Sequence, residues 1–511
     1  MRVRVLTAEG MRAWEAACLA AGTPAATLMR RAGEAAARRI LATVPEVRRA
    51  GALVVAGRGN NGGDAWVVAE SLAAAGCPVE VRALGEPNAE VAREAAARAR
   101  VALATAVPPS GVPAVVVDGL LGLGVAGPPR AEVAAAIEEI RGLAARGAVV
   151  VALDLPSGID ATTGAGAPVV RADRTLTFGA LKWGLLLRRD EAGAIEVLDI
   201  GLDEALLAPT APVLVDGAWV HGQVPALPAD AHKGVRRRLV VVGGAEGMAG
   251  AAVWVSRGAH RSGIGMTRLA VGAASVPVVQ TLVPQATAAR WPMTEEELEP
   301  LVAWAHAMVV GPGLGEGSKS RALVERLLVR WRGPVVLDAD ALNVFAGEPR
   351  TLGSLLAGRP AVVTPHPAEA ARLLRCEVDT VLADREGSAR ELARTLGATV
   401  LLKGPPTVIA DGAGAVAVSA SGAPTLGTAG SGDLLAGIVG TLLAQTLDAS
   451  HAAQVAAWVH GRAGERAASA VSTRGADLDD VVTALGLVWG ERASPPPGDV
   501  LTMLSAVGRT P

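Results

Sequence analysis

The chain has 511 residues, too many for one ordinary domain of about 100–200 residues and enough for two large ones. Hydrophobic residues make up 50% and charged residues 19%, which excludes a disordered or fibrous chain and leaves ample material for buried cores. The formal net charge of −2 gives no overall basic field, so the composition argues against nucleic acid as a partner.

Cysteine spacing and hydropathy indicate where we expect the chain to work. Cys18, Cys77 and Cys376 lie too far apart for a disulfide framework or a thiolate zinc cluster. The opening MRVRVLTAEG lacks the apolar stretch of a signal peptide, and the apolar run 434–444 is shorter than the ~20 residues that span a bilayer. We therefore expect a cytoplasmic protein without a membrane partner.

The N-terminal half alternates helical and strand patterns. Residues 8–41 predict two helices, broken at Gly22-Thr-Pro24, and a strand–loop–helix–strand unit follows. Continuous apolar strands that alternate with helices predict a parallel sheet covered on both faces. The unit consists of a predicted strand at 52–56, a glycine-rich loop at 57–63, a helix at 64–75 and a strand at 78–83. Further strands are predicted at 114–117, 149–153, 174–178 and 194–198.

A second α/β series follows a proline-rich stretch at 206–228, where we place the domain boundary. The predicted domains are 1–214, which is Rossmann-like, and 215–492, which is a second α/β domain. The segment 493–511 contains Pro495-Pro-Pro497 and predicts a mobile tail. Strands are predicted at 239–242, 308–310, 335–337, 361–364, 400–403 and 408–410, and helices from about 250, 431 and 450.

The glycine-rich loop at 57–64 lies between a predicted strand and a predicted helix. Its glycines let backbone N–H groups approach a phosphate, and the helix N-terminus favours negative charge. A GxGxxG pattern alone is weak, because the acidic partner should end the second strand and Glu80 falls inside it. A tight turn without ligand is the alternative interpretation.

Three predicted strand ends carry polar residues that an open sheet would bring to one crevice. Asn61, Asp118 and Ser157 could present one carboxylate and two neutral oxygens to a single ion. With no soft ligand present, this set favours a monovalent cation over a transition metal. The alternative for Asp118 and Asp154 is helix capping or turn formation.

Four motifs resemble the epimerase domain of NAD(P)H-hydrate repair enzymes: NNGGD at 60–64, DGLLGLG at 118–124, DLPSG at 154–158 and TFGALKWG at 177–184. The resemblance covers about residues 5–212 and implies interconversion of the R and S forms of hydrated NADH or NADPH. It implies potassium at Asn61, Asp118 and Ser157, and acid/base roles for Asp154 and Lys182. The implied substrate-binding residues are Asn60, Asn61, Gly62, Gly63, Asp64, Gly122, Leu123, Gly124, Val125, Ala126, Gly127, Pro128 and Asp154.

Three positions depart from the pattern of that family. Ala65 follows NNGGD where the family usually has glycine, and Gly119 replaces the alanine of DALLG. Arg30 stands where the early LMExAG pattern has glutamate, which puts any role of that position in doubt.

The second half carries its own strand-end motifs. Gly427-Thr-Ala-Gly-Ser-Gly-Asp433 precedes an apolar helix, where N–H groups can gather on an anion and Asp433 could deprotonate an attacking hydroxyl. The alternative is that Asp433 only caps the helix. Lys403 at a strand end could meet nucleotide phosphates, or it could mark a surface turn. His366, held between two prolines, could serve a site or be purely structural.

GTAGSGD, LDADALN at 337–343 and TPHP at 364–367 resemble the ribokinase-like dehydratase domain of the same repair system, over about residues 218–490. Ala368 stands where the family's TPHPGE has glycine. The resemblance implies a nucleotide site at Lys403, Gly404, Pro405, Pro406, Thr407 and Gly432. It implies a hydrate-binding site at Ala251, Gly313, His366 and Asp433, with Asp433 as the base.

The implied reaction phosphorylates the hydroxyl of the S hydrate, and phosphate then leaves while the ring nitrogen restores the double bond. The resemblance implies ADP or ATP as phosphate donor, with ADP favoured, and Mg²⁺ at the phosphates. It also implies a homo-oligomer such as a tetramer.

Three other functions remain open from the sequence. The main rival is a ribokinase-like kinase of a vitamin precursor or sugar, fused to a noncatalytic nucleotide-binding module. A noncatalytic first domain beside an active second one is another. A dehydrogenase is the third, although no constellation for hydride transfer is apparent.

Overall fold

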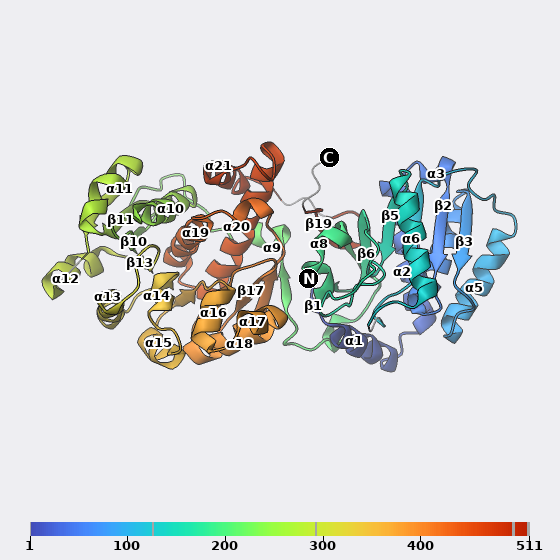
Figure 1. The fold of residues 1–511 in the computed structure, drawn as a ribbon, viewed down its shortest axis with the longest axis horizontal. Helices are drawn as coiled ribbons and strands as arrows, with labels where there is room; N and C mark the ends of the chain where they lie inside the picture. The colour runs from blue at the N-terminus through green and yellow to red at the C-terminus, as the bar shows by residue number, and fades with distance from the viewer. Residues whose placement is uncertain (1, 125–126, 292–293, 493–495, 508–511) are drawn as a thin grey trace.

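The computed structural model describes residues 2–124, 127–291, 294–492 and 496–507. Figure 1 shows two lobes side by side along the long axis, one built by the first two fifths of the chain with one strand from its end, and one by the residues between. Each lobe is a sheet with helices on both faces, which confirms the predicted two-domain α/β class. Among these residues no helix is long and apolar enough to cross a membrane.

The first lobe is built on a seven-stranded sheet of order β19-β8-β6-β5-β4-β2-β3. Its strands are parallel except β19, which is antiparallel to β8. The predicted strands are confirmed to within two residues. Their bounds are β2 Ala52–Ala56, β3 Val79–Ala83, β4 Val115–Gly119, β5 Val149–Leu153, β6 Arg174–Phe178, β8 Ala194–Leu198 and β19 Val500–Leu504.

Side chains on alternate positions of these strands pack against different helix layers. Val54 and Val117 share a core with α1, α2, α4 and α5, whereas Val55 and Val116 share one with α6. The predicted break between the first two helices is confirmed, because α2 begins directly after Pro24. The helices are α1 Ala8–Ala20, α2 Ala25–Thr43, α3 Val47–Ala50, α4 Asn60–Ala74, α5 Glu90–Leu103, α6 Ala131–Ala145, α7 Trp183–Leu187 and α8 Arg189–Ala192.

The strand order creates a crevice at one edge of this sheet. The chain runs from β2 outward to β3 and then returns to the other side of β2 for β4. Loops that leave the carboxyl ends of β2 and β4 therefore diverge to opposite faces, and ligands of doubly wound sheets bind at such a switch point. The motifs at 57–64, 118–124 and 154–158 follow β2, β4 and β5.

The second lobe is built on a ten-stranded sheet of order β12-β11-β10-β13-β14-β15-β16-β17-β18-β9. Its strand pairs in the described part of the chain are parallel, apart from the antiparallel β16–β17 and β17–β18 pairs. The sequence did not predict β9, β11, β12 or β18. The strands are β9 Val213–Val215, β10 Arg238–Val242, β11 Met266–Val271, β12 Thr287–Arg290, β13 Ala307–Val310, β14 Val335–Leu337, β15 Ala361–Val363, β16 Thr399–Leu402, β17 Thr407–Ala410 and β18 Val416–Ser419.

Helices cover both faces of this sheet as well. Val241 and Val309 pack with α10, α11, α19, α20 and α21, while Val240 and Val310 pack with α12, α13, α15, α16, α17 and α18. The helices are α9 Gly217–His221, α10 Ala249–Arg261, α11 Val276–Leu282, α12 Glu295–Trp304, α13 Ser318–Arg330, α14 Asp340–Asn343, α15 Pro349–Leu356, α16 Pro367–Leu374, α17 Val378–Ala383, α18 Arg385–Leu396, α19 Ser431–Thr446, α20 Ala449–Ala470 and α21 Leu478–Val488.

Two segments near the predicted domain limits differ from expectation. Strand β9 pairs with β18, so the chain enters the second sheet at Val213, before the predicted boundary after residue 214. Val500–Leu504, which lies within the predicted mobile tail, returns to the first lobe as β19 and hydrogen-bonds to β8. The parts of that tail at 493–495 and 508–511 lie outside the described residues.

The lobes are joined by more than a linker. Strand β1, Val5–Leu6, pairs with β7, Leu181–Lys182. Val5, Leu181 and Trp183 belong to the same continuous core as Leu214 and Val418 of the second lobe. Figure 1 shows β1 and β19 in the middle of the molecule, where the two lobes meet.

Candidate active sites

A cavity of about 940 Å³ opens at the carboxyl edge of the first sheet. The first turn of α4 contributes Asn61 to its lining, the loops after β4 and β5 contribute Gly122 and Asp154, and α1 contributes Glu15. The predicted loop at 57–63 ends earlier than expected, because α4 begins at Asn60 and carries NNGGD in its first turn. Glycine is required at Gly62, since a Cβ there would overlap the carbonyl oxygen of Gly57.

Asp154 and Lys182 form an ion pair at the inner end of this cavity. Lys182 Nζ lies 2.5 Å from Asp154 Oδ1, and the exposed fractions of the two side chains are 0% and 10%. Asp154 holds a left-handed backbone conformation, φ 61°, directly after β5. Such conformations in non-glycine residues carry strain and cluster at functional sites. The structure thus brings together the two residues predicted as acid and base.

The predicted cation ligands are also brought together, beside the cavity that Asn61 lines. Ser157 donates to Asp118 through its hydroxyl, at 2.6 Å, and its backbone N–H, at 2.8 Å. The Asn61 amide nitrogen donates to the carbonyls of Leu121 and Leu153, so its Oδ1 must point the other way. This buried Oδ1 has no hydrogen-bond partner in the described structure.

The charge of Asp118 is not balanced by any ion pair within the described ranges. Burial raises the pKa of Asp118 to about 6, although hydrogen bonds from Ser157 and Leu120 oppose the shift. A buried carboxylate beside an orphaned amide oxygen suits a weakly hydrated cation. The residues therefore fit a potassium ion.

Two further carboxylates belong to this site, and one of them was not expected from the sequence. Burial raises the pKa of Asp64 well above its usual range, and the charges of Asp154 and Glu15 add to the shift. Burial and the charge of Asp154 likewise raise the pKa of Glu15. The only sequence signal for Glu15 is its place on the amphipathic α1, whose position over the cavity depends on long-range packing.

The remaining predicted residues of this site fall into three groups. Asn60, Gly122, Leu123, Gly124, Gly127 and Pro128 line the cavity. Gly62 and Gly63 are not among the lining residues; they pack inside the fold, where Gly63 lies against Met29. Val125 and Ala126 lie outside the described residues.

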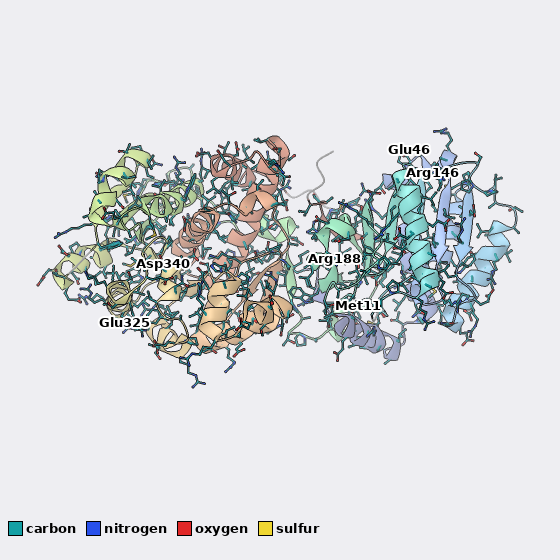
Figure 2. All side chains as sticks on the ribbon, in the orientation of Figure 1. Met11, Glu46, Arg146, Arg188, Glu325 and Asp340 are labelled. Carbon is teal, nitrogen blue, oxygen red and sulfur yellow. The ribbon has the colours of Figure 1, made fainter. Side chains whose placement is uncertain are left out.

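In the second lobe, the predicted residues gather at the carboxyl ends of five neighbouring strands. Lys403, directly after β16, lies 2.8 Å from Asp338 Oδ1 and 3.8 Å from Glu369 Oε2. Asp338 follows β14, and Glu369 lies in the first turn of α16, after β15. Both carboxylates are buried. Figure 2 shows Asp340, the first residue of α14, near the middle of this lobe.

Asp433 lies in the first turn of α19, as predicted, and faces this charge cluster. Burial raises the pKa of Asp433 to about 7, and the charges of Asp338, Asp340 and Glu369 add to the shift while Lys403 opposes it. A carboxylate with a pKa near 7 can accept a proton from a hydroxyl at neutral pH and release it again. In the described structure no backbone N–H donates a capping hydrogen bond to the Asp433 carboxylate at the start of α19, so the capping alternative is not supported.

The other predicted hydrate-binding residues lie at the same edge of the sheet. Gly313 follows β13 with φ +60°, and a Cβ there would lie 3.0 Å from the Cβ of Ala251 on α10. His366 caps α16: its Nδ1 accepts from the N–H groups of Ala368 and Glu369. The imidazole proton must therefore sit on Nε2, and burial with the charge of Lys403 lowers the pKa of this ring.

The predicted nucleotide loop joins β16 to β17. Thr407 Oγ1 donates to the Gly404 carbonyl at 3.0 Å, and Pro405 and Pro406 complete the turn. A Cβ on Gly432 would lie 3.4 Å from Lys403 Nζ, so the first turn of α19 lies beside the ammonium. The structure thus brings this loop and the N-terminus of α19 to one place.

Two residues beside this loop were missed by the sequence analysis. The guanidinium of Arg385, the first residue of α18, packs against Gly404, and its Nε and Nη1 are buried with no partner in the described ranges. His460 of α20 is buried, and its Nε2 lies 3.2 Å from the Oγ of Ser431. Ser431 is the residue between Gly430 and Gly432 of the glycine-rich motif. No local pattern marks either residue, because each reaches the site from another helix.

Comparison with known proteins identifies both halves. Residues 25–184 match the family model described as YjeF-related protein N-terminus, and residues 239–485 match the model described as NAD(P)H-hydrate dehydratase. The bifunctional NAD(P)H-hydrate repair enzyme of Escherichia coli is 36% identical, with 90% of this chain and 88% of the relative covered. That of Gloeobacter violaceus is 37% identical, with 93% and 95% covered.

A solved structure, the ADP/ATP-dependent NAD(P)H-hydrate dehydratase of Bacillus subtilis co-crystallised with ATP and Mg²⁺, aligns with a TM-score of 0.49 and 28% identity, over 55% of this chain and 99% of that one. The two curated relatives cover nearly the whole chain, both lobes included. The chain therefore belongs to the family of bifunctional NAD(P)H-hydrate repair enzymes.

Proposed function

We propose that the first lobe interconverts the R and S forms of hydrated NADH and NADPH, and that the second lobe dehydrates the S form to NAD(P)H. The dehydration consumes ADP, with ATP as the alternative donor, and releases AMP or ADP together with phosphate. The observation that carries the proposal is the presence of two separate acid/base sites, Asp154 with Lys182 and Asp433 with Lys403, in a chain of this family.

In the first lobe, Asp154 is the group that exchanges protons with the hydrated ring, and Lys182 holds its negative charge in place. Asn60, Asp64 and the segment 122–128 contribute to the substrate site. A potassium ion would be held by Asn61, Asp118 and Ser157. Bound there, it would supply positive charge beneath the substrate, which the orphaned Asn61 oxygen and the unbalanced Asp118 support.

In the second lobe, Asp433 accepts the proton of the hydrate's hydroxyl as that oxygen attacks the terminal phosphate of the nucleotide. Phosphate is a better leaving group than hydroxide, so phosphorylation makes loss of the oxygen possible. Ala251, Gly313 and His366 contribute to hydrate binding, and the Nε2–H of His366 is held by Glu369, whose Oε1 lies 3.3 Å away.

The nucleotide is held by Lys403–Thr407 and Gly432, where Lys403 and the N-terminus of α19 face the phosphates. The unpartnered guanidinium of Arg385 supports an anion at this loop. Asp338 and Asp340 would hold Mg²⁺, which would neutralise phosphate charge. The cluster fits a cation, since Asp338, Glu369 and Asp433 share Lys403, and Asp340 adds a further negative charge near Asp433.

A direct test is incubation of the purified chain with a mixture of R and S hydrates, with and without ADP or ATP. We expect the absorbance of reduced nicotinamide to return only when a nucleotide is present, with one phosphate released for each molecule repaired. A nucleotide-dependent loss of substrate without that absorbance would contradict the proposal. It would favour the kinase alternative, which the family membership does not support.

Light scattering of the same preparation tests the homo-oligomer implied by the resemblance.

A further inference from the structure

Thr177 lies in β6, fully buried, and the proposed function gives it no role. We propose that Thr177 is a positioning residue for epimerisation: with Lys182 it fixes one oxygen of Asp154 and leaves Oδ2 as the only atom of the pair that reaches the substrate. This inference rests on the function proposed for the first lobe.

The first step is the number of donors on Lys182. An ammonium group has three N–H bonds. The Nζ atom lies 2.5 Å from Asp154 Oδ1, 2.9 Å from Thr177 Oγ1 and 2.8 Å from the Phe178 carbonyl oxygen. All three donors are therefore used inside the protein, and the side chain has no exposed surface. Lys182 cannot contact the substrate or give it a proton without breaking this arrangement.

The second step is the direction of the Thr177 hydroxyl. Its oxygen accepts from Lys182, so its own proton must go elsewhere. Asp154 Oδ1 lies 3.1 Å away, whereas the alternative acceptor, the Ala180 carbonyl, lies at 3.5 Å. The shorter contact and the negative charge both favour donation to Asp154.

The third step is the asymmetry of the carboxylate. Lys182, Thr177 and the backbone N–H of Phe178 all donate to Oδ1 of Asp154. Within the described residues no hydrogen bond reaches Oδ2, and Asp154 lines the cavity. The donors that hold Oδ1 therefore set the rotation of the carboxylate, and the proton exchanged with the substrate is carried on Oδ2.

The chain offers a matched control on the same strand. Thr175 is also fully buried, two residues before Thr177 and on the same face of β6, and its hydroxyl donates to the Ala192 carbonyl at 2.7 Å. Thr175→Val makes the same change of hydroxyl to methyl without touching Asp154. Thr177→Ser keeps the hydroxyl at the position of interest.

The experiment measures epimerisation kinetics of these three variants, with wild-type protein as reference. For Thr177→Val we expect kcat to fall about 10- to 100-fold, the range for loss of a hydrogen bond to a charged group, with KM unchanged. Thr177→Ser should return kcat to within about threefold of wild type. Thr175→Val should keep wild-type kcat even where its urea midpoint falls.

Three kinetic outcomes would overturn the inference: wild-type kcat in Thr177→Val, an equal loss in Thr175→Val, or a rise in KM alone, which would mean that Thr177 touches the substrate. An inactive wild-type protein would instead contradict the proposed function. A crystal structure of Thr177→Val tests the positioning role in that case too. We expect the Asp154 carboxylate to rotate or split between two conformations, and an unchanged carboxylate would overturn the inference.

Discussion

Each lobe contains a lysine paired with a buried aspartate at the carboxyl edge of its sheet, but the two pairs have different roles. In the first lobe the lysine is paired with Asp154 itself, the residue proposed to react. In the second, Lys403 is paired with Asp338, and no cation among the described residues forms an ion pair with Asp433. The same two residue types therefore stabilise a charged carboxylate in one site and leave a carboxylate ready to bind a proton in the other.

The largest expected effect separates the two lobes completely. Asp433→Asn removes the proposed base, and we expect dehydration to fall at least about 1000-fold while epimerisation stays at the wild-type rate. The measurement is nucleotide-dependent recovery of reduced nicotinamide beside a chiral assay of the two hydrates. Loss of both activities would contradict separate sites.

The next change tests the pairing in the first lobe. Lys182→Met leaves Asp154 buried without its cation, and we expect epimerisation to fall about 100-fold and the free energy of unfolding to fall by about 3–5 kcal/mol. Adding Asp154→Asn to Lys182→Met removes the unpaired charge, so most of the stability should return without the activity. Urea unfolding measures the free energy of unfolding of both variants. A Lys182→Met protein as stable as wild type would show that the pair is not buried as described.

The pH dependence tests the unpaired carboxylate of the second lobe. Burial and the carboxylates of Asp338, Asp340 and Glu369 raise the pKa of Asp433 to about 7, against the opposing charge of Lys403. The base must be ionised to act, so kcat/KM for dehydration should rise with pH and level off above about 7. One pH unit below the pKa, kcat/KM should be roughly a tenth of its plateau value. The kcat/KM of epimerisation, measured in parallel, should not show this rise. A dehydratase profile that is flat from pH 5 to 8 would contradict the assignment.

The smallest expected effect concerns the cation. Replacing potassium by lithium, which is smaller and holds its water more tightly, should slow epimerisation several-fold and leave dehydration nearly unchanged. Rates in matched chloride salts at constant ionic strength measure this. An equal response in both reactions would count against a cation at Asn61, Asp118 and Ser157.

The strands that lie in the middle of each sheet could be predicted from the sequence. β5, β6, β8 and β14 have the predicted bounds, because runs of apolar residues buried on both faces leave a strong local pattern. β12 was missed because it is an exposed edge strand with the sequence TAAR. β19 was missed because its partner β8 lies about 300 residues earlier, and no local pattern records that pairing.

The sites follow the same division. Asn61, Asp118 and Ser157 could be grouped in advance because the carboxyl ends of neighbouring parallel strands meet at one edge. Glu15, Arg385 and His460 could not, because each comes from a helix whose position depends on packing across the whole lobe. The roles of Thr177 and Asp338 depend on distances between side chains, which a sequence does not give.

The central claim is that two independent sites in one chain act in sequence, and pure R hydrate with ADP tests it most directly. Wild-type protein should restore reduced nicotinamide after a lag. Neither Asp154→Asn nor Asp433→Asn should restore it faster than the R hydrate converts to the S hydrate without an enzyme. A mixture of the two variants should restore it, because each supplies the site that the other lacks. Failure of that mixture, while each variant keeps its own half-reaction, would contradict the account.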